Sequence, residues 1–298
     1  MNPNSSSPAD APGANPASPL LKESASHSPP NQYAELKRLI KENGLLDQQP
    51  AYFAGKVLLN LTLLAVGLTL LLILENTWLQ LLNAAYLAFV FVQISLLAHD
   101  FGHRQFSFRV SWKNDWLTLV FGNLLLGDSR QWWIDKHNEH HGHPNQLDVD
   151  PDVDIPLLAF EEEQALDKRG LACFVVKYQA ALIFPLSFLQ ALSMLRSSIQ
   201  FLFERRAKST LAESLTLGAH FVLYFGLVFS VLKPLQALLF IAVHRGLFGM
   251  FMVSIFAPNN KAMPVLERES QLDFLRRQSA VQVADNSQLP AGNSTPCA

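Results

Sequence analysis

Two long uncharged segments in the first third of the chain decide the fold. Residues 57–74 read VLLNLTLLAVGLTLLLIL and residues 78–98 read WLQLLNAAYLAFVFVQISLLA. An α-helix needs about 20 apolar residues to cross a bilayer, and only a short link separates the two segments, so we expect an antiparallel helical hairpin. Residues 215–232 and 235–257 repeat this arrangement around a Lys-Pro pair. The sequence therefore predicts an integral membrane protein with four spans.

The composition agrees with a membrane protein. Of the 298 residues, 49% are hydrophobic and only 16% are charged, whereas soluble domains carry about 25% charged residues. A net charge of −2 gives no general reason to expect nucleic-acid binding. The two cysteines, Cys173 and Cys297, are too few and too far apart for a disulfide framework or a cysteine-based metal site. Any bound metal is therefore expected to be held by histidine.

The remaining segments are expected to flank or cap the spans. Residues 1–32 are rich in Pro, Ser and Ala and predict a disordered tail. Residues 33–44 predict a short helix at the membrane surface, stopped by Gly44. Residues 178–195 are apolar but contain Pro185, so we assign them to the interface or to a buried helix rather than to a fifth span. The expected fold is all-α, an integral membrane bundle of two helical hairpins with a cytoplasmic helical cap.

The distribution of basic residues predicts the orientation of the chain. Cytoplasmic loops of membrane proteins are enriched in Lys and Arg. The two hairpin tips contain one basic residue between them, Lys233, whereas residues 99–171 contain seven. Four spans then place both termini on the cytoplasmic side, together with a cap built from residues 99–214 and the C-terminal segment.

Five of the nine histidines form two close clusters. His99 and His103 are four positions apart, so they share one face of a helix. His137, His140 and His141 also fall on one helical stripe. Two such stripes facing each other would make an imidazole-rich site, and neutral imidazole binds iron, zinc, copper or nickel far better than magnesium or calcium. The sequence predicts a transition-metal site.

Several short stretches resemble the membrane fatty-acid desaturases, a family with histidine boxes and a non-haem di-iron centre. They are HDFGHRQ (99–105), WWIDKHNEHH (132–141), DPD (150–152), FAPNNKAMP (256–264) and DFLRRQ (273–278). The resemblance covers roughly residues 33–278, and it is specific because two histidine boxes follow the second span in this order. Residues 279–298 do not share it, and we expect them to form an unstructured tail.

The resemblance implies a particular chemistry. In this family two irons activate O2 and remove hydrogens from an unactivated acyl chain, a reaction that protein side chains cannot perform alone. By position, the catalytic metal ligands would be His99, His103, His137, His140 and His141. Asp100, Asn138 and Asn259 would orient these imidazoles. The reaction also implies an external electron donor, either a ferredoxin or a cytochrome, and a long acyl chain attached to a lipid or to coenzyme A.

The sequence departs from the family pattern in its C-terminal part. Relatives have a third box, His-x-x-His-His, after the fourth span, whereas this sequence contains no histidine after His244. Asn260 stands where relatives commonly have a histidine. A truncated or frame-shifted gene product would account for both observations, and we expect weak iron binding and impaired activity. The alternatives are a related lipid, alkane or carotenoid hydroxylase, a catalytically inactive membrane remnant, and a metal or small-solute transporter.

Polar residues inside the spans and one acidic run leave alternatives open. His220 and His244 lie within spans, where such side chains are either functional or hydrogen-bonded to a neighbouring helix. Arg245 costs about 2.5–3.5 kcal/mol at mid-membrane, so it is expected to face the bundle interior or, in a tilted helix, to snorkel to the surface. The four aspartates of residues 148–154 lack the glycine and glutamate of a calcium-binding loop, and we expect them to form a solvated surface.

Overall fold

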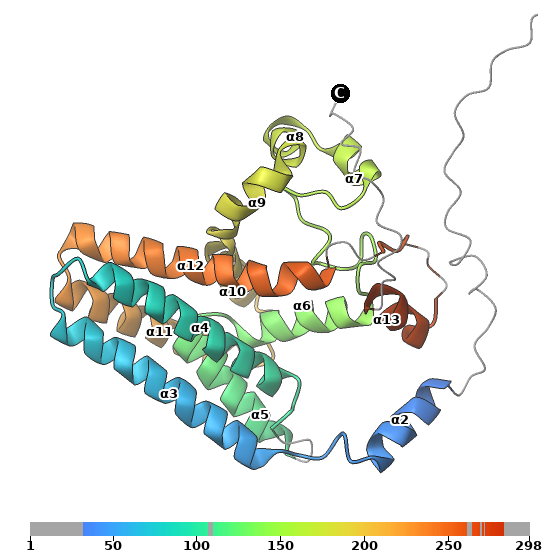
Figure 1. Ribbon diagram of the computed structural model, residues 1–298, viewed down its shortest axis with the longest axis horizontal. Helices are drawn as coiled ribbons and strands as arrows, with labels where there is room; N and C mark the ends of the chain where they lie inside the picture. Colours follow the sequence, from blue (N-terminus) through green and yellow to red (C-terminus); the bar gives the residue numbers. More distant parts are fainter. Residues whose placement is uncertain (1–31, 107–109, 261–263, 269, 271, 283–298) are drawn as a thin grey trace, which may run out of the picture.

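The structure is a computed structural model that describes residues 32–106, 110–260, 264–268, 270 and 272–282. Among these residues the regular structure is helical, apart from one β-bridge between Gln146 and Leu266. Figure 1 shows the long helices side by side, with a cap of shorter helices toward one end. The all-α prediction is confirmed. Nearly all of the two expected tails lies outside the described residues.

Four helices are long and apolar enough to cross a membrane, which confirms the four predicted spans of an integral membrane protein. They are α3 (Pro50–Ile73), α4 (Gln80–Gly102), α11 (Thr210–Val231) and α12 (Pro234–Asn260). Each helix is longer than the apolar segment that predicted it, because helical hydrogen bonding continues into flanking residues. Pro50 and Pro234 open their helices, at the position where the missing N–H of proline costs no hydrogen bond.

Hydrogen bonds from side chains tie the two hairpins together at their tips. The buried side chain of Gln80 donates from Nε2 to the carbonyl oxygen of Leu71 at 2.7 Å, across the first hairpin. The backbone N–H of Lys233 donates to Oδ1 of Asn76 at 3.1 Å, which joins the second hairpin to the first. Backbone groups at membrane depth must be satisfied within the protein, and these contacts do so where the helices end.

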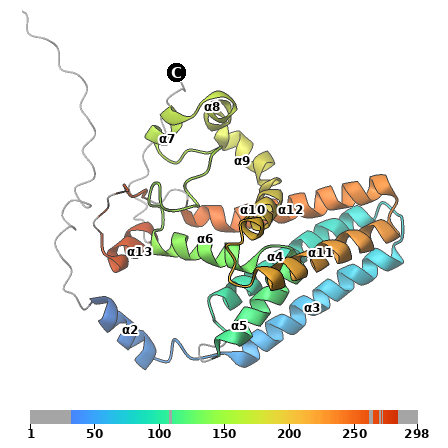
Figure 2. The same cartoon turned by 180° about the vertical axis from the view of Figure 1, so that it is seen from behind.

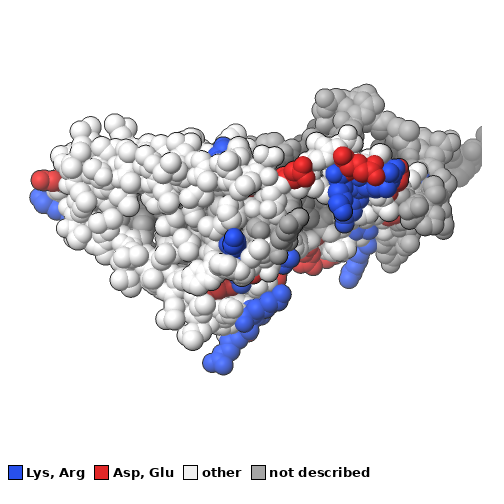
Figure 3. Space-filling model, turned by 90° about the horizontal axis from the view of Figure 1, so that it is seen from below, with Lys and Arg blue, Asp and Glu red and all other residues white. Residues whose placement is uncertain are grey.

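Helix α4 lies at the centre of the bundle. In the most apolar stretch of 18 residues in α4, 56% of the residues are buried inside the protein, compared with 17% in the corresponding stretches of α3 and α11. The outward-facing side chains of α3 and α11, such as Leu58 and Val222, are 69% and 74% exposed and form a surface suited to lipid. Figure 3 shows a broad surface without charged residues over this part of the molecule. The end of α4 that carries the first histidine box is therefore held by packing on several sides.

Shorter helices complete the fold. Helix α2 (Gln32–Glu42) ends before Gly44, whose φ of +69° stops it as predicted. The others are α5 (Ser111–Thr118), the π-helix η1 (Leu119–Leu126), α6 (Arg130–Gly142), α7 (Glu162–Asp167), α8 (Gly170–Lys177), α9 (Gln179–Ser187), α10 (Gln190–Phe203) and α13 (Phe274–Gln282). Helix α13 continues past residue 278, so the expected C-terminal tail begins inside a helix.

Residues 178–195 do not form a straight span. Helices α8 and α9 meet at Tyr178 with a bend of 106°, and α9 contains Pro185, which lacks the N–H that a continuous helix needs. Helix α10 then begins at Gln190. The apolar stretch packs against α12, and α8 and α9 together are long and apolar enough for a broken span or a re-entrant loop.

The short apolar segment before the second histidine box packs between α4 and α11 as α5 and η1. A π-helix is rare and occurs mostly at functional sites. It ends at Gly127, whose φ is +87°, and a Cβ atom there would lie 2.6 Å from the ring of His220. Only glycine fits this turn, which directs the chain into α6.

Candidate metal centre

Four imidazole rings from two helices meet at the cap end of the bundle. His99 lies in the last turn of α4 and His103 directly follows that helix, while His137 and His141 lie one turn apart on α6. Nε2 of His137 lies 3.1 Å from Nε2 of His99, 2.9 Å from Nε2 of His103 and 3.0 Å from Nε2 of His141. The four residues form one candidate metal-binding group.

This donor set fits a transition metal. Nitrogens about 2.1 Å from an ion lie about 3.0 Å apart when they occupy neighbouring positions of an octahedral shell, and the Nε2 separations here have that value. His99 Nδ1 donates to Oδ1 of Asp100 at 3.2 Å, which leaves the Nε2 lone pair facing the other rings. Asp100 therefore holds the orienting position that the sequence suggested.

The electrostatics of the site favour the neutral, metal-binding form of its histidines. Burial and the neighbouring imidazoles lower the pKa of His103 to about 4 and the pKa of His137 to about 2. Burial and His140 lower the pKa of His141 as well. A metal ion binds only unprotonated imidazole, so these ligands are available at neutral pH without displacing a proton.

The fifth candidate ligand, His140, points elsewhere. Its Nδ1 donates to the two carboxylate oxygens of Asp150 at 2.9 and 3.0 Å, and Asp152 lies 3.6 Å away. Burial alone would lower the pKa of His140, but the hydrogen bond and charge of Asp150 outweigh it and raise the pKa. Because Nδ1 is the donor, Nε2 of the neutral ring keeps its lone pair. The rings of His140 and His141 are 5.5 Å apart, so His140 lies beside the four-histidine cluster and outside it.

Asp150 corrects one expectation from the sequence. The aspartates of residues 148–154 were expected on a solvated surface, but the side chain of Asp150 is fully buried. Besides His140, it accepts hydrogen bonds from the backbone N–H groups of Asn145 at 2.7 Å and Asp152 at 2.9 Å. It therefore fixes the loop that follows α6 as well as the ring of His140. Four alternating aspartates give no sequence signal that distinguishes the buried one.

The other two residues expected to orient the imidazoles take no such part in the described structure. Asn138 lies on the exposed side of α6, because it is one position from His137 and so points about 100° away around the helix. The side chain of Asn259 lies outside the described part of the structure. Sequence reasoning instead missed Trp133, whose ring stacks on His137 with centroids 4.4 Å apart and also meets His99 at 5.4 Å. Trp133 packs on Gly102, where any larger side chain would clash with it.

The beginning of α6 is anchored to two other helices. Ser129 caps the helix, accepting from the N–H of Trp132, and its own N–H donates to Oγ of Ser198 on α10 at 2.9 Å. Its hydroxyl donates to Oε2 of Glu213 on α11 at 2.6 Å. The carboxylate of Glu213 is fully buried and lies 3.6 Å from Nε of Arg130. These contacts fix where α6 begins, and hence where its histidines lie.

The end of α6 is held by α13, which lies beside it in Figure 2. Arg277 donates from Nη1 to the carbonyl oxygen of Gly142 at 2.9 Å, and Gln278 donates from Nε2 to that of His141 at 2.7 Å. The last carbonyls of a helix have no partner within it, and basic side chains commonly satisfy them. The C-terminal DFLRRQ stretch thus supports the second histidine box.

A small cavity of about 30 Å³ adjoins the cluster, which is room for about two water-sized molecules. Among the residues that line it are His99, Thr118, Asp128, Trp133 and Met194. Burial raises the pKa of Asp128 to about 7, and the positive charge of Arg245 counters that rise only in part. The cavity therefore has one wall that can hold a proton at neutral pH.

Three polar residues of the third and fourth spans, Arg245, His220 and His244, are hydrogen-bonded inside the bundle. Arg245 donates to the carbonyl oxygen of Leu126 at 3.0 Å and to Nε2 of His220 at 2.7 Å. His220 then donates from Nδ1 to the carbonyl oxygen of Leu124 at 3.0 Å, and Nδ1 of His244 bonds the hydroxyl of Tyr224 at 2.7 Å. Arg245 faces the bundle interior, as one of the two expectations had it, and does not snorkel to the surface.

A bundle of four candidate membrane spans with a histidine-lined metal site in its cap defines a class, the membrane proteins with a histidine-ligated metal centre. Comparison with known proteins makes the assignment specific. The sequence pattern of the fatty acid desaturase family matches residues 76–278, about two thirds of the chain. The chain belongs to the fatty acid desaturase family, a family of oxidoreductases.

Similar proteins with assigned activities are themselves desaturases. An acyl-lipid (9-3)-desaturase from Physcomitrium patens is 28% identical over 78% of this chain and 46% of its own length. A Δ6-fatty-acid desaturase from Caenorhabditis elegans is 28% identical over 89% of this chain and 60% of its own length. A Δ8-fatty-acid desaturase from Helianthus annuus is 32% identical over 43% of this chain and 31% of its own length. The chain thus spans about half the length of the first two of these relatives and about a third of the third.

Proposed function

We propose that this chain is the catalytic part of a fatty-acid desaturase, which uses O2 to introduce a double bond into a long acyl chain. The observation that carries the proposal is the cluster of four imidazoles at the junction of α4 and α6. The Nε2 atoms of His99, His103 and His141 all lie within 3.1 Å of Nε2 of His137. Membership of the family supports it. We assign residues 33–278 to the desaturase domain.

The proposed ligands divide into two groups. His99, His103, His137 and His141 would hold one iron, and His140 would serve a second, with its Nε2 kept free by the hydrogen bond from Nδ1 to Asp150. When bound, the irons supply the oxidising power to break unactivated C–H bonds, drawing on O2 and on electrons from an external ferredoxin or cytochrome.

The surrounding residues prepare the site for this chemistry. Trp133 covers one side of His137 and limits the access of water. Reduction of O2 to water consumes protons, and Asp128, on the wall of the adjoining cavity, holds one at a carboxylate oxygen at neutral pH. The acyl chain, attached to a lipid or to coenzyme A, would reach the site from the apolar surface of the bundle. The basic loops around the cap support a cytoplasmic position for the histidines and both termini.

Expression in a host without its own polyunsaturated fatty acids tests the proposal. Because the sequence contains no third histidine box, we expect only low levels of new unsaturated fatty acids by gas chromatography with mass spectrometry, and weakly held iron at fewer than two ions per chain in the purified protein. His137→Ala should abolish both results, because Nε2 of His137 lies nearest to all the other ligands. Asn138→Ala, on the exposed side of the same helix, should change neither.

Two outcomes would contradict the proposal. Hydroxylated in place of unsaturated fatty acids would identify a hydroxylase. An unchanged fatty-acid profile from a membrane-inserted chain that holds two irons and receives electrons from an added donor would identify a non-catalytic member of the family.

A further inference from the structure

Helices α8 to α10 expose a row of large apolar side chains outside the four spans. Leu171 on α8 is 73% exposed, Leu192 on α10 is 53% exposed and Phe203 at the end of α10 is 83% exposed. An exposed apolar surface of this extent marks a protein or membrane contact. The opposite face of α10, with Met194 and Phe201, is buried in the protein. Helix α10 therefore packs one face against the protein and leaves an apolar face free to contact a membrane or another protein.

The elbow between α9 and α10 lies at membrane depth. Gly249 of α12 is so close to it that a Cβ atom there would lie 2.7 Å from the carbonyl oxygen of Ser187, and one at Gly246 would lie 2.7 Å from the ring of Phe188. We take Pro234, the first residue of α12, as the far boundary of the hydrocarbon core and α12 as perpendicular to the membrane. At 1.5 Å per residue, these glycines then lie about 18 and about 22 Å from that boundary. The hydrocarbon core is about 30 Å thick. The elbow thus lies about 10 Å inside the boundary that is nearest to the histidine cluster.

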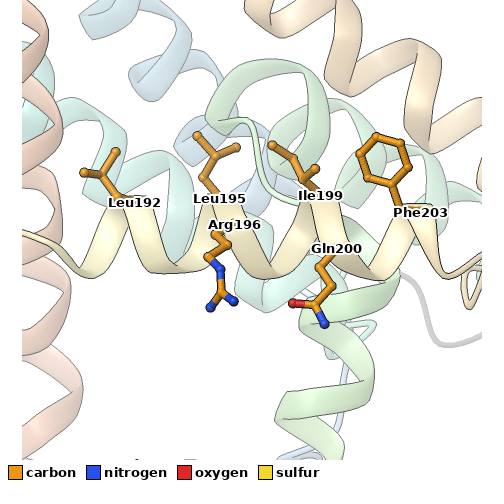
Figure 4. A pocket seen from close by; sticks show the side chains of 6 residues that line it. All are labelled: Leu192, Leu195, Arg196, Ile199, Gln200 and Phe203. Carbon is orange, nitrogen blue, oxygen red and sulfur yellow. The ribbon is translucent and has the colours of Figure 1, made fainter. Parts of the chain in front are cut away.

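The surface of α10 has the two sides of an interfacial helix. An open groove of about 500 Å³ runs along it. Figure 4 shows Leu192, Leu195, Ile199 and Phe203 on one side of the helix, with Arg196 and Gln200 projecting from the other. Residues at this spacing form a continuous stripe. An apolar stripe bordered by a cation is the pattern of a helix that lies in the plane of the headgroups.

The charge of the segment selects the kind of surface. Residues 168–208 contain seven basic residues and a single acidic one, Glu204. The basic residues are Lys168, Arg169, Lys177, Arg196, Arg205, Arg206 and Lys208. They border the apolar helices α8 and α10 on both ends, where a helix lying in the headgroup region meets lipid phosphates. A basic segment next to apolar anchors binds anionic lipids.

We propose that residues 168–208 form an interfacial arm that docks on a bilayer surface carrying anionic lipids, with the α9–α10 elbow inserted into the leaflet beside the histidine cluster. This arm adds to the four spans a second, charge-selective attachment. Because the buried face of α10 carries Met194, which lines the cavity next to His99, the lipid-bound arm forms one wall of the metal centre.

Depth measurement tests the insertion. The full chain, with Cys173→Ser and Cys297→Ser, is reconstituted in phosphatidylcholine vesicles containing phosphatidylglycerol, and a nitroxide label is placed at Leu192→Cys or Phe203→Cys. We expect both labels to be relaxed by O2 and protected from a water-soluble nickel complex, at a depth of about 5–10 Å. Leu166→Cys, on the acidic helix α7 and 52% exposed, is the matched control in water. Labels at 192 and 203 that are as open to nickel as the label at 166 would overturn the proposal.

Lipid selectivity tests the charge. Association of spin-labelled phosphatidylglycerol is compared with that of spin-labelled phosphatidylcholine, and we expect the native chain to prefer the former at least about twofold. Lys177→Gln with Arg196→Gln should lower this ratio toward one, whereas Arg268→Gln with Arg276→Gln, outside the arm, should leave it unchanged. Equal loss in both pairs, or no preference in the native chain, would overturn the lipid assignment. Crosslinking of the arm to an acidic protein with no lipid preference would assign it to a protein partner.

Discussion

Neighbouring histidines on α6 have different partners. His140 and His141 are adjacent, so their side chains point about 100° apart around the helix axis. His141 faces His137 at 3.0 Å, whereas His140 donates to the buried carboxylate of Asp150. A carboxylate that accepts from one ring nitrogen fixes the tautomer and makes the other nitrogen a better ligand. Asp150 is thus a positioning residue for the proposed second metal.

Replacing Asp150 tests this role. Asp150→Asn keeps the size of the side chain but removes the charge that holds the Nδ1 proton of His140. We expect the affinity for the more weakly held metal to fall about 10-fold to 100-fold, measured by titration of the metal-free protein with Co²⁺ or Fe²⁺. Asp148→Asn, whose side chain is 64% exposed, should leave the affinity unchanged. Equal affinities in all three proteins would show that Asp150 only supports the loop.

The lowered pKa values of the cluster predict how stability depends on pH. In the folded chain His103 and His137 stay neutral down to about pH 4 and about pH 2, whereas in the unfolded chain they take up protons below about pH 6.5. The unfolded state then binds more protons, so the stability contributed above pH 6.5 is lost as the pH falls toward the folded values. Asp128 has a raised pKa and acts in the opposite direction between its ordinary value and about 7.

We therefore expect the melting temperature of the metal-free protein in detergent to fall by about 3 °C or more between pH 7.5 and pH 5. His103→Gln should make this fall smaller, and Asp128→Asn should make it larger. A pH dependence that is the same in His103→Gln as in the native chain would show that His103 is not buried in its neutral form.

Among the helices, α6 carries most of the site and is fixed at both ends. Its start is bonded to Ser198 on α10 and to Glu213 on α11, and its end is bonded to side chains of α13. A helix held in this way cannot rotate or slide without breaking buried hydrogen bonds. The precision of the four-histidine cluster thus depends on contacts that contain no histidine.

Removing the anchor at the start of α6 should therefore cost stability. Glu213→Ala leaves the hydroxyl of Ser129 without its buried acceptor, while Arg130 keeps its ion pair with Asp115 at 3.0 Å, and we expect a loss of about 1–3 kcal/mol in the free energy of unfolding. Glu213→Gln, which can still accept from Ser129, should lose less. Glu204→Gln, which is 45% exposed, is the control and should change the melting temperature little. A Glu213→Ala protein as stable as this control would contradict the assigned anchor.

Across the whole molecule, charge and hydropathy divide the surface. Most of the span surface carries no charge, apart from residues such as Lys56 near the start of α3, and charged residues of both signs lie around the cap, as Figure 3 illustrates. Loops rich in Lys and Arg are usually retained on the cytoplasmic side of the membrane. The basic residues of the loops support the orientation that we propose, with the hairpin tips outside and the metal centre inside.

Cysteine accessibility measures this orientation. In intact cells, a membrane-impermeant maleimide should label Lys233→Cys and Glu75→Cys at the hairpin tips, in a chain whose native cysteines are replaced by serine. Glu163→Cys on α7 should be labelled only after the cells are permeabilised. The reverse pattern would place the histidine cluster on the outer side.

The sequence alone predicted the elements that depend on local patterns. Four spans follow from runs of apolar residues, since the cost of exposing a polar backbone to lipid allows no other spanning structure for such segments. The spacing along a helix predicted His99 and His103 on one face and His137, His140 and His141 on another, and the structure brings all of these except His140 into one cluster. Pro185 led to the expectation that residues 178–195 would not form one straight span, but the bend of 106° lies at Tyr178 and Pro185 lies inside α9.

Only the tertiary structure decided which of these side chains meet. It separates His140 from the other four histidines, buries one aspartate of four, and pairs Arg245 of α12 with His220 of α11. It also places the α9–α10 elbow against two glycines of α12. Each of these contacts joins residues from different elements, and each depends on how close two helices approach and on how they are rotated. Local sequence patterns fix the face of a helix, whereas packing between helices fixes what that face touches.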